Sequence, residues 1–299
     1  MLLLSLVGEQ PIPILLVNRF LNPEQHLLAH SSKTERVAAN LQSLLPNVKL
    51  LKLEDAYHLE QIRKHFESVY QPNLVFDLTG GTKPMAWAGY QVAYTHKAQI
   101  VYLVSEGKQS KLVQFNFAPS GIEQTAEVLP TLITIDDYLM AHGIKAEANL
   151  VASSNQQEVA LKHFFEAHTD ECQHNIKFPA FEVDFLIRRA NQVAVVEAKS
   201  GKIKRFGIDQ LTTITGREYL GTYTGRIWIV QQKPGAQLQE LANAYQIDIV
   251  LISITQHSTG RWRLTKESQT RLQEVLERVL GPKTIEREGR NHPNPFSQT

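Results

Sequence analysis

Apolar residues in the first third of the chain come in short runs that alternate with longer amphipathic stretches. The runs predict strands over 1–7, 26–31, 48–53, 74–79 and 99–104, and the stretches predict helices over 12–20, 33–45, 57–69 and 82–96. Continuous apolar runs such as 100–104 are typical of strands covered on both faces. Strands alternating with helices of this length indicate βαβ units. We therefore expect a Rossmann-like α/β domain with a parallel sheet, and a further candidate strand at 111–117.

The pattern changes after residue 134. A short helix is expected at 135–143, inside a connector that spans 135–154. The pattern then predicts helices over 155–168, 206–220, 236–245 and 266–280, and strands over 181–188, 192–198, 225–231 and 247–253. The resulting division is a first domain at 1–134, a linker at 135–154, a second α/β domain at 155–281 and a flexible tail at 282–299.

Composition supports two globular domains without pointing to a partner. The chain has 299 residues, a formal net charge of +1 and a single cysteine, Cys172. The length suits two domains of about 150 residues each, and the charge gives no overall attraction to nucleic acid or membrane. One cysteine excludes an internal disulfide and fits a cytoplasmic location. The apolar N-terminus lacks a basic flank, so we interpret it as a buried strand and not as a signal peptide.

Polar residues and glycines follow the predicted strands of the first half. The stretch Asp77-Leu78-Thr79-Gly80-Gly81-Thr82-Lys83-Pro84 joins a strand to a helix, yet it matches neither a Walker loop nor a dinucleotide fingerprint. Backbone N–H groups at such a helix start attract phosphate, although a purely structural turn is the alternative. Strand-end loops converge at one edge of a parallel sheet. The candidate ligand-binding residues are Gly8, Glu9, Gln10, Ser31, Ser32, Lys33, Thr34, Thr79, Gly80, Gly81, Thr82, Lys83 and Ser105.

Two acidic strands carry the chemical pattern of the second half. In 181–188, alternation places Val183, Phe185 and Ile187 on one face and Asp184 on the other. A turn at 190–191 would set Asp184 opposite Glu197, and Glu182 opposite Lys199. Neighbouring carboxylates repel unless a cation offsets them, and Mg²⁺ or Mn²⁺ suits oxygen ligands. The alternative is a surface hairpin with a Glu182–Lys199 salt bridge.

This pattern resembles the core of PD-(D/E)XK nucleases, over about residues 155–255. The resemblance implies a metal-dependent nuclease with Glu158, Asp184, Glu197, Lys199 and Gln210 as catalytic residues. It implies that Asp184, Glu197 and Glu158 bind the metal, Mn²⁺ or Mg²⁺. The order helix, strand, strand, helix, strand agrees with this interpretation.

The strand-end motifs of the first half resemble those of the CARF domain, the CRISPR-associated Rossmann fold. Together the two resemblances imply a CARF–PD-(D/E)XK effector nuclease of type III CRISPR systems. Such a protein is expected to be a homodimer that binds cyclic oligoadenylate, with cyclic tetra-adenylate favoured, and then cleaves DNA, RNA or both in antiviral defence. Two alternatives stay open. One is a ligand-sensing transcription regulator with a helix-turn-helix, and the other is a ring nuclease using Lys33, Thr82 and Lys83.

Overall fold

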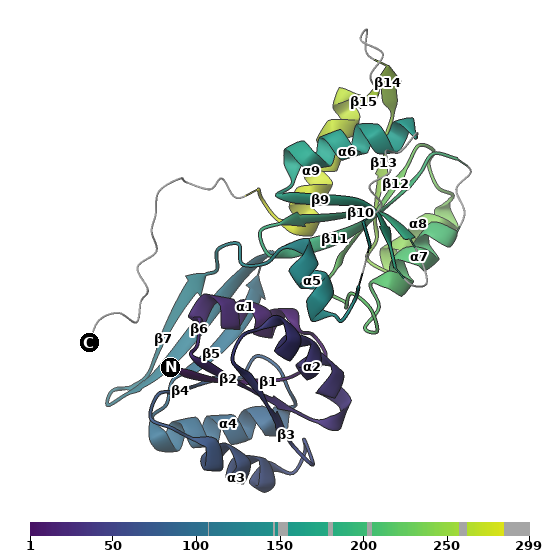
Figure 1. Ribbon diagram of the computed structural model, residues 1–299. Helices are drawn as coiled ribbons and strands as arrows, with labels where there is room; N and C mark the ends of the chain where they lie inside the picture. Colours follow the sequence, from purple (N-terminus) through teal and green to yellow (C-terminus); the bar gives the residue numbers. More distant parts are fainter. Residues whose placement is uncertain are drawn as a thin grey trace.

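Two large β-sheets, each flanked by helices on both faces, and a small two-stranded sheet make up the described part of the computed structural model of the protein (Figure 1). The structure describes residues 1–106, 108–145, 147–148, 155–178, 182–201, 205–256 and 262–283. The predicted flexible tail lies outside these residues from 284 onward, and so do residues 149–154 of the predicted linker. None of the described helices has the length and apolar character of a membrane span.

The first sheet has the strand order β3-β2-β1-β4-β5-β6-β7. Its strands are β1 (Leu2–Leu6), β2 (Gln25–His30), β3 (Val48–Lys52), β4 (Leu74–Asp77), β5 (Ile100–Glu106), β6 (Gln109–Ala118) and β7 (Gly121–Val128). The first five pair in parallel, as predicted, whereas β5, β6 and β7 pair antiparallel. The sheet is therefore mixed and not wholly parallel. The sequence pattern missed β7 because all eight of its residues are exposed, so no apolar alternation marks it.

Helices cover both faces of this sheet. Helices α1 (Ile12–Leu21) and α2 (Glu35–Leu44) lie on one face, and α3 (Leu59–Val69) and α4 (Lys83–His96) lie on the other (Figure 1). Leu3 packs with the α1 and α2 side, whereas Leu2 and Leu4 pack with the α3 and α4 side. This double covering explains the continuous apolar runs of the central strands. A short 3-10 turn, Ser32–Thr34, leads into α2.

The second sheet has the order β13-β12-β11-β10-β9-β8. Its strands are β8 (Glu147–Ala148), β9 (Glu171–Lys177), β10 (Glu182–Arg189), β11 (Gln192–Lys199), β12 (Gly225–Val230) and β13 (Asp248–Leu251). Helices α7 (Phe206–Ile214) and α8 (Ala236–Ala244) pack on one face, and α6 (Gln156–His168) and α9 (Lys266–Leu280) pack on the other. A small separate hairpin, β14 (Ile254–Gln256) and β15 (Trp262–Leu264), packs through Leu264 against the core on the α6 and α9 side. Strand β9 was not predicted, because its sequence is mostly polar.

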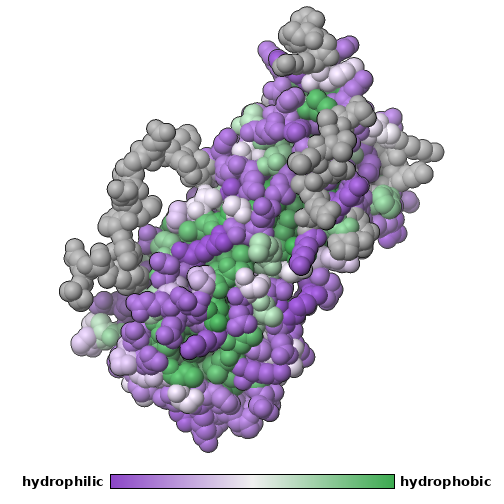
Figure 2. All heavy atoms as spheres, viewed as in Figure 1, coloured by the Kyte–Doolittle hydropathy of each residue, from purple (hydrophilic) through white to green (hydrophobic). Residues whose placement is uncertain are grey.

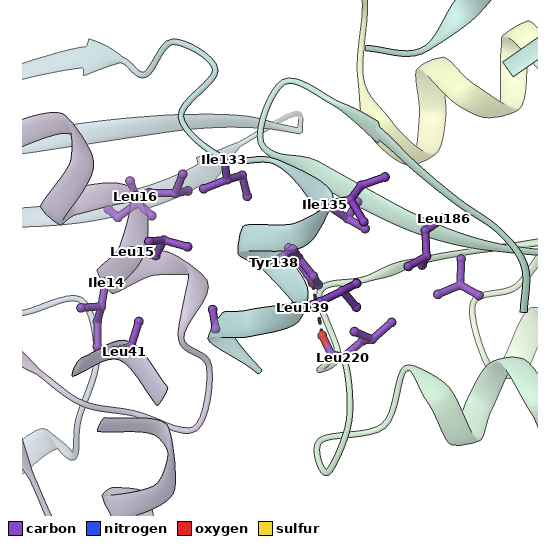
Figure 3. Close-up of a cluster of buried hydrophobic side chains, with 14 of the residues drawn as sticks. Ile14, Leu15, Leu16, Leu41, Ile133, Ile135, Tyr138, Leu139, Leu186 and Leu220 are labelled. Carbon is purple, nitrogen blue, oxygen red and sulfur yellow. Dashed lines mark hydrogen bonds between the residues drawn. The ribbon is translucent and has the colours of Figure 1, made fainter. Parts of the chain in front are cut away.

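Helix α5 (Ile135–Ala141) lies between the two halves, at the start of the predicted linker. Tyr138 and Leu139 are buried in one continuous core that also holds Leu15 from α1 and Leu220 from the second half (Figure 3). The Tyr138 hydroxyl donates to the carbonyl of Leu220 at 3.2 Å. Apolar side chains also reach the surface around this junction (Figure 2). The two halves therefore share buried apolar surface, which stabilises their present arrangement.

Candidate functional site

The carboxyl ends of β1, β2, β4 and β5 surround a cavity of about 1210 Å³. Residues 8–10, 31–34, 79–82 and Ser105 all line it, so the structure brings together every predicted ligand residue except Lys83. Lys83 is the first residue of α4, and its side chain is exposed outside the cavity lining. Pockets for drug-sized ligands measure ~300–1000 Å³. This cavity is large enough for a bigger molecule.

Two strand-end loops approach each other so closely that glycine is required. A Cβ on Gly80 would lie 2.2 Å from the carbonyl oxygen of Leu6 and 3.1 Å from the nitrogen of Gly8. Gly81 has φ +74°, a conformation that L side chains rarely adopt. The N–H groups of Gly80 and Gly81 donate to no other described residue. They are therefore available to an anionic ligand.

The next residue, Thr82, is the N-cap of α4. Its hydroxyl accepts a hydrogen bond from the N–H of Met85 at 3.3 Å and donates to the carbonyl of Ala56 at 2.6 Å. The second bond ties the glycine loop to the loop before α3. That loop contributes Glu54, Asp55 and Tyr57 to the cavity wall, which the sequence analysis missed because it follows a strand with an unremarkable polar pattern.

A chain of buried polar side chains joins α1, β2 and β1. Asn18 Nδ2 donates to His26 Nδ1 at 2.9 Å, so His26 Nε2 carries the proton that it donates to Ser5 Oγ, also at 2.9 Å. His26 and Ser5 are fully buried. Burial lowers the pKa of His26 to about 3, which keeps the ring neutral. Buried polar side chains within predicted strands were the sequence feature that could have revealed this network.

Asp77 connects this region to the ligand cavity. The carboxylate Oδ1 accepts hydrogen bonds from the hydroxyl of Thr79 at 2.6 Å and from its N–H at 3.1 Å. Thr79 Oγ1 in turn accepts from the N–H of Leu103 on β5 at 2.8 Å. Burial raises the pKa of Asp77, and the hydroxyls of Thr79 and Ser5 act against that rise. Thr79 is thus held in one rotamer at the cavity wall.

The charges that line the cavity are mixed. The acidic lining residues are Glu9, Glu54, Asp55 and Glu277, and the basic ones are Lys33, Lys108 and Arg278. Two of these charges already have partners, because Glu9 pairs with Arg217 at 3.3 Å and Arg278 pairs with Asp248 at 2.5 Å. An anion in this cavity would therefore rely on backbone N–H groups together with Lys33 and Lys108, and not on a strongly positive field.

The predicted hairpin of the second half is present with the predicted register. Phe185 pairs with Val196 and Arg189 with Gln192, around a turn at Ala190-Asn191. Counted back from the turn, the last β10–β11 pair is Phe185 with Val196, so Asp184, the preceding residue, lies just outside the paired region. There, Asp184 Oδ2 accepts a hydrogen bond from the N–H of Ala198 at 2.6 Å.

The predicted alternation along β10 is wrong at one point. Val183 packs with the core on the α7 side, whereas Phe185 and Ile187 pack on the α6 and α9 side. The change of face falls at Asp184, where the pairing with β9 is also interrupted. The pairs on either side of Asp184 keep the same register with β9, so no residue is inserted and the break is not a β-bulge. The sequence pattern could not reveal this change of face, because no particular residue type marks a break in strand pairing.

Among the candidate catalytic carboxylates, Glu197 is buried next to a lysine, whereas Asp184 and Glu158 are half-buried. Glu197 is 1% exposed, and Lys199 Nζ forms an ion pair with its Oε1. Lys199 therefore pairs with Glu197. The surface-hairpin alternative required a pair between Lys199 and Glu182 instead. No described group donates a hydrogen bond to Glu197 Oε2. A buried carboxylate oxygen without a donor is costly unless a cation or a proton satisfies it.

The electrostatics of this cluster shift all three groups. Burial and the neighbouring Asp184 raise the pKa of Glu197 to about 7. Burial likewise raises the pKa of Asp184, although the Ala198 N–H and Lys199 oppose the rise. For Lys199, burial alone would lower the pKa, but Glu197 and Asp184 outweigh it and the pKa is raised. Mutual repulsion of carboxylates at one place is what a divalent cation relieves.

Glu158 and Gln210 lie near this cluster but make other contacts. Glu158, in the first turn of α6, accepts a hydrogen bond from Asn155 Nδ2 at 2.9 Å, and its charge adds to the rise in the Asp184 and Glu197 pKa values. Gln210 on α7 donates to the carbonyl of Glu182. Within the part of the chain that the structure describes, no three acidic, histidine or cysteine side chains are close enough together to hold a metal. The carboxylate oxygens of Glu158, Asp184 and Glu197 are ligands that suit a hard cation, but these three side chains are too far apart in this structure to bind one ion together.

Comparison with known families finds a match for the first half of the chain. Residues 2–138 match the family model of the Card1 CARF domain. No curated protein matches the chain.

Solved structures share the fold over most of the chain. Can2 from Sulfobacillus thermosulfidooxidans in complex with cyclic tetra-adenylate is 14% identical with a TM-score of 0.69, covering 93% of this chain and 99% of that chain. Protein VC1899 from Vibrio cholerae is 10% identical with a TM-score of 0.72, covering 94% and 99%. A type III CRISPR defence DNA nuclease activated by cyclic oligoadenylate is 16% identical with a TM-score of 0.58, covering 91% of this chain and 51% of that one. The comparisons thus show that residues 2–138 match the Card1 CARF domain model and that the solved structures share the fold over most of the chain.

Proposed function

We propose that this protein is a metal-dependent endonuclease of type III CRISPR defence that cyclic oligoadenylate activates. The observation that carries the proposal is the pairing of a strand-end cavity in the CARF domain with a cluster of Asp184, buried Glu197 and Lys199 in the other half. Two proteins of similar fold support it, since one is described in complex with cyclic tetra-adenylate and another as a nuclease activated by cyclic oligoadenylate.

The cavity offers groups for each part of a cyclic tetra-adenylate ring. Phosphates would meet the free N–H groups of Gly80 and Gly81 and the ammonium of Lys33. Adenines would stack on aromatic rings, of which Tyr57 and Tyr102 line the cavity. Asp77 fixes the position of the Thr79 hydroxyl, and this hydroxyl would recognise the ligand through a hydrogen bond.

In the nuclease half, Asp184 and Glu197, with Glu158 nearby, would hold Mn²⁺ or Mg²⁺. The ion, when bound, lowers the pKa of a water and offsets charge on the scissile phosphate. Lys199 keeps its proton, because Glu197 and Asp184 raise its pKa, so it can stabilise negative charge on a phosphate of DNA or RNA. Gln210 is assigned to positioning, since it fixes the backbone of Glu182 beside Asp184.

We also propose that the protein acts as a homodimer through α4. The helix exposes Trp87 (60%), Tyr90 (42%) and Tyr94 (52%) along one side, and Phe117 of β6 packs edge-on against both tyrosines. The adjoining strand β7 is exposed along its whole length. Aromatic clusters of this kind are enriched at protein interfaces, and a second copy would bury them.

The test uses the full chain with cyclic tetra-adenylate, a plasmid and an RNA, with and without Mn²⁺. We expect cleavage only when both ligand and metal are present. Glu197→Ala and Lys199→Ala should abolish cleavage and leave ligand binding intact, whereas Glu240→Gln, an exposed acid on α8, should cleave normally. Retained cleavage in Glu197→Ala would refute the catalytic assignment.

The same assay separates the alternatives. A ring nuclease would shorten the cyclic tetra-adenylate without cutting plasmid or RNA. A transcription regulator would bind DNA without cleaving it, but the described second half consists of a six-stranded sheet with helices on both faces. We therefore favour the nuclease.

A further inference from the structure

The second half of the chain forms one wall of the ligand cavity. This wall combines the β10–β11 turn, the loop before β12 and the last turns of α9. Its lining residues are Asn191, Gln192, Val193, Tyr223, Glu277 and Arg278. The cavity is therefore not a property of the CARF domain alone.

Tyr223 is the aromatic residue of this wall. Its side chain is 67% exposed although it lines the cavity, and it has no hydrogen-bond or ring partner among the described residues. The loop that carries it is nevertheless fixed on both sides. Leu220 and Thr224 are buried, and Thr224 Oγ1 lies 2.8 Å from the hydroxyl of Tyr138 on α5. The backbone thus presents an unpartnered aromatic ring to the cavity.

The same loop contacts a ligand-binding loop of the first half. Gly221 has φ +79°, and a Cβ there would lie 2.2 Å from Gln10 Oε1. Arg217 pairs with Glu9 at 3.3 Å. Both partners, Glu9 and Gln10, line the cavity. The loop is therefore in contact with the site from two sides, through its own tyrosine and through the loop after β1.

We propose that Tyr223 stacks on an adenine of the bound cyclic oligoadenylate, so that the ligand bridges the two halves of the chain. The inference rests on the proposed function and names one recognition residue for that ligand. A tyrosine suits this role because its rigid ring offers a large stacking face, and every purine presents one in return.

The bridge explains how occupancy of the cavity reaches the nuclease cluster. Asn191 and Gln192, at the turn of the β10–β11 hairpin, line the cavity, and Glu197 lies five residues further along the same strand as Gln192. At about 3.3 Å per residue this is roughly 17 Å of continuous strand. Asn191 is also bonded to the carbonyl of Pro130 and the N–H of Leu132. A ligand that contacts this wall therefore acts on the hairpin that carries both carboxylates.

The experiment measures binding of cyclic tetra-adenylate to the full chain by calorimetry without metal, and then cleavage with Mn²⁺. We expect Tyr223→Ala to bind on the order of tenfold more weakly and to need correspondingly more ligand for cleavage, whereas Tyr223→Phe retains the ring and should bind like the wild type. Tyr245→Ala is the matched control, since Tyr245, the residue directly after α8, is 42% exposed and lies outside the cavity lining.

Thermal melts should show all three variants folded, because the Tyr223 and Tyr245 rings are exposed. Binding by Tyr223→Ala within twofold of the wild type would overturn the bridge while leaving the proposed function in place. A wild-type protein that binds no cyclic tetra-adenylate would overturn both.

Discussion

Glu197→Gln should change how the stability of the metal-free protein depends on pH. Burial and Asp184 raise the pKa of Glu197 from 4.5 to about 7. Below pH 4.5 the carboxyl is protonated in both the folded and the unfolded chain, and it contributes no pH dependence. As the pH rises through the interval to 7, the unfolded chain loses its proton first, so the free energy of unfolding falls. At about 1.4 kcal/mol per pKa unit, the loss approaches about 3 kcal/mol.

The assay is urea unfolding of wild type and Glu197→Gln in EDTA at pH 4.5, 6 and 8. The amide brings its own cost in this buried place, but that cost does not vary with pH and cancels in the comparison. The difference in unfolding free energy should therefore move in favour of the variant by roughly 2–3 kcal/mol between pH 4.5 and 8. The same variant should have no nuclease activity. A difference that is constant with pH would refute the burial argument for Glu197.

Three further outcomes follow from other parts of the structure. Gly80→Ala should destabilise the protein by about 1–3 kcal/mol in thermal melts and abolish ligand binding in calorimetry, because its Cβ would overlap backbone atoms. Gly235→Ala, with open space around the new Cβ, should change neither stability nor ligand binding. Because His26 has a pKa of about 3 in the folded protein, only the unfolded chain takes up its proton as the pH falls from 6.5 to 5, and the free energy of unfolding should fall by about 2 kcal/mol. His26→Gln should remove that loss in urea titrations. An unchanged dependence of the unfolding free energy on pH would argue against this role of His26. Trp87→Ala combined with Tyr94→Ala should convert a dimer to a monomer in light scattering, and a persistent dimer would place the interface elsewhere.

The sequence predicted most elements of the fold because local pattern and burial agree in them. Strands β1 and β5 are mostly apolar and lie between two helical layers, so their apolar runs identify them. Strands β7 and β9 escaped prediction because β7 is exposed along its length and β9 is mostly polar. Their pairing is decided by neighbouring strands, and no local pattern records that.

The ligand residues could be predicted because they follow strands directly in the sequence. The parallel arrangement of β1, β2, β4 and β5 then brings those strand ends together. The wall contributed by Tyr223 and Arg278 could not be predicted, because it depends on how α5 docks the second half against the first. In the hairpin, turn chemistry fixed the register correctly, whereas the break at Asp184 depends on its pairing with β9.

The arrangement of the carboxylates bears on where activation acts. Asp184 accepts a hydrogen bond from the N–H of Ala198, and Glu197 pairs with Lys199. Near neutral pH a cation must therefore compete with Lys199 and, through the raised pKa of Glu197, with a proton. Small shifts of the hairpin would change that competition. Since its turn lines the ligand cavity, we expect metal binding and ligand binding to be coupled.

Coupling of this kind is reciprocal: if cyclic tetra-adenylate tightens Mn²⁺ binding, Mn²⁺ must tighten cyclic tetra-adenylate binding by the same factor. A typical coupling of 1–3 kcal/mol corresponds to about 5–150-fold. The wild-type protein keeps Lys199 and both carboxylates, and without nucleic acid it has no nuclease substrate, so the two affinities can be measured by calorimetry. Each ligand should then tighten the other by an equal factor of at least about fivefold. Equal affinities with and without the second ligand would instead place activation at nucleic-acid binding, after the metal site is already filled.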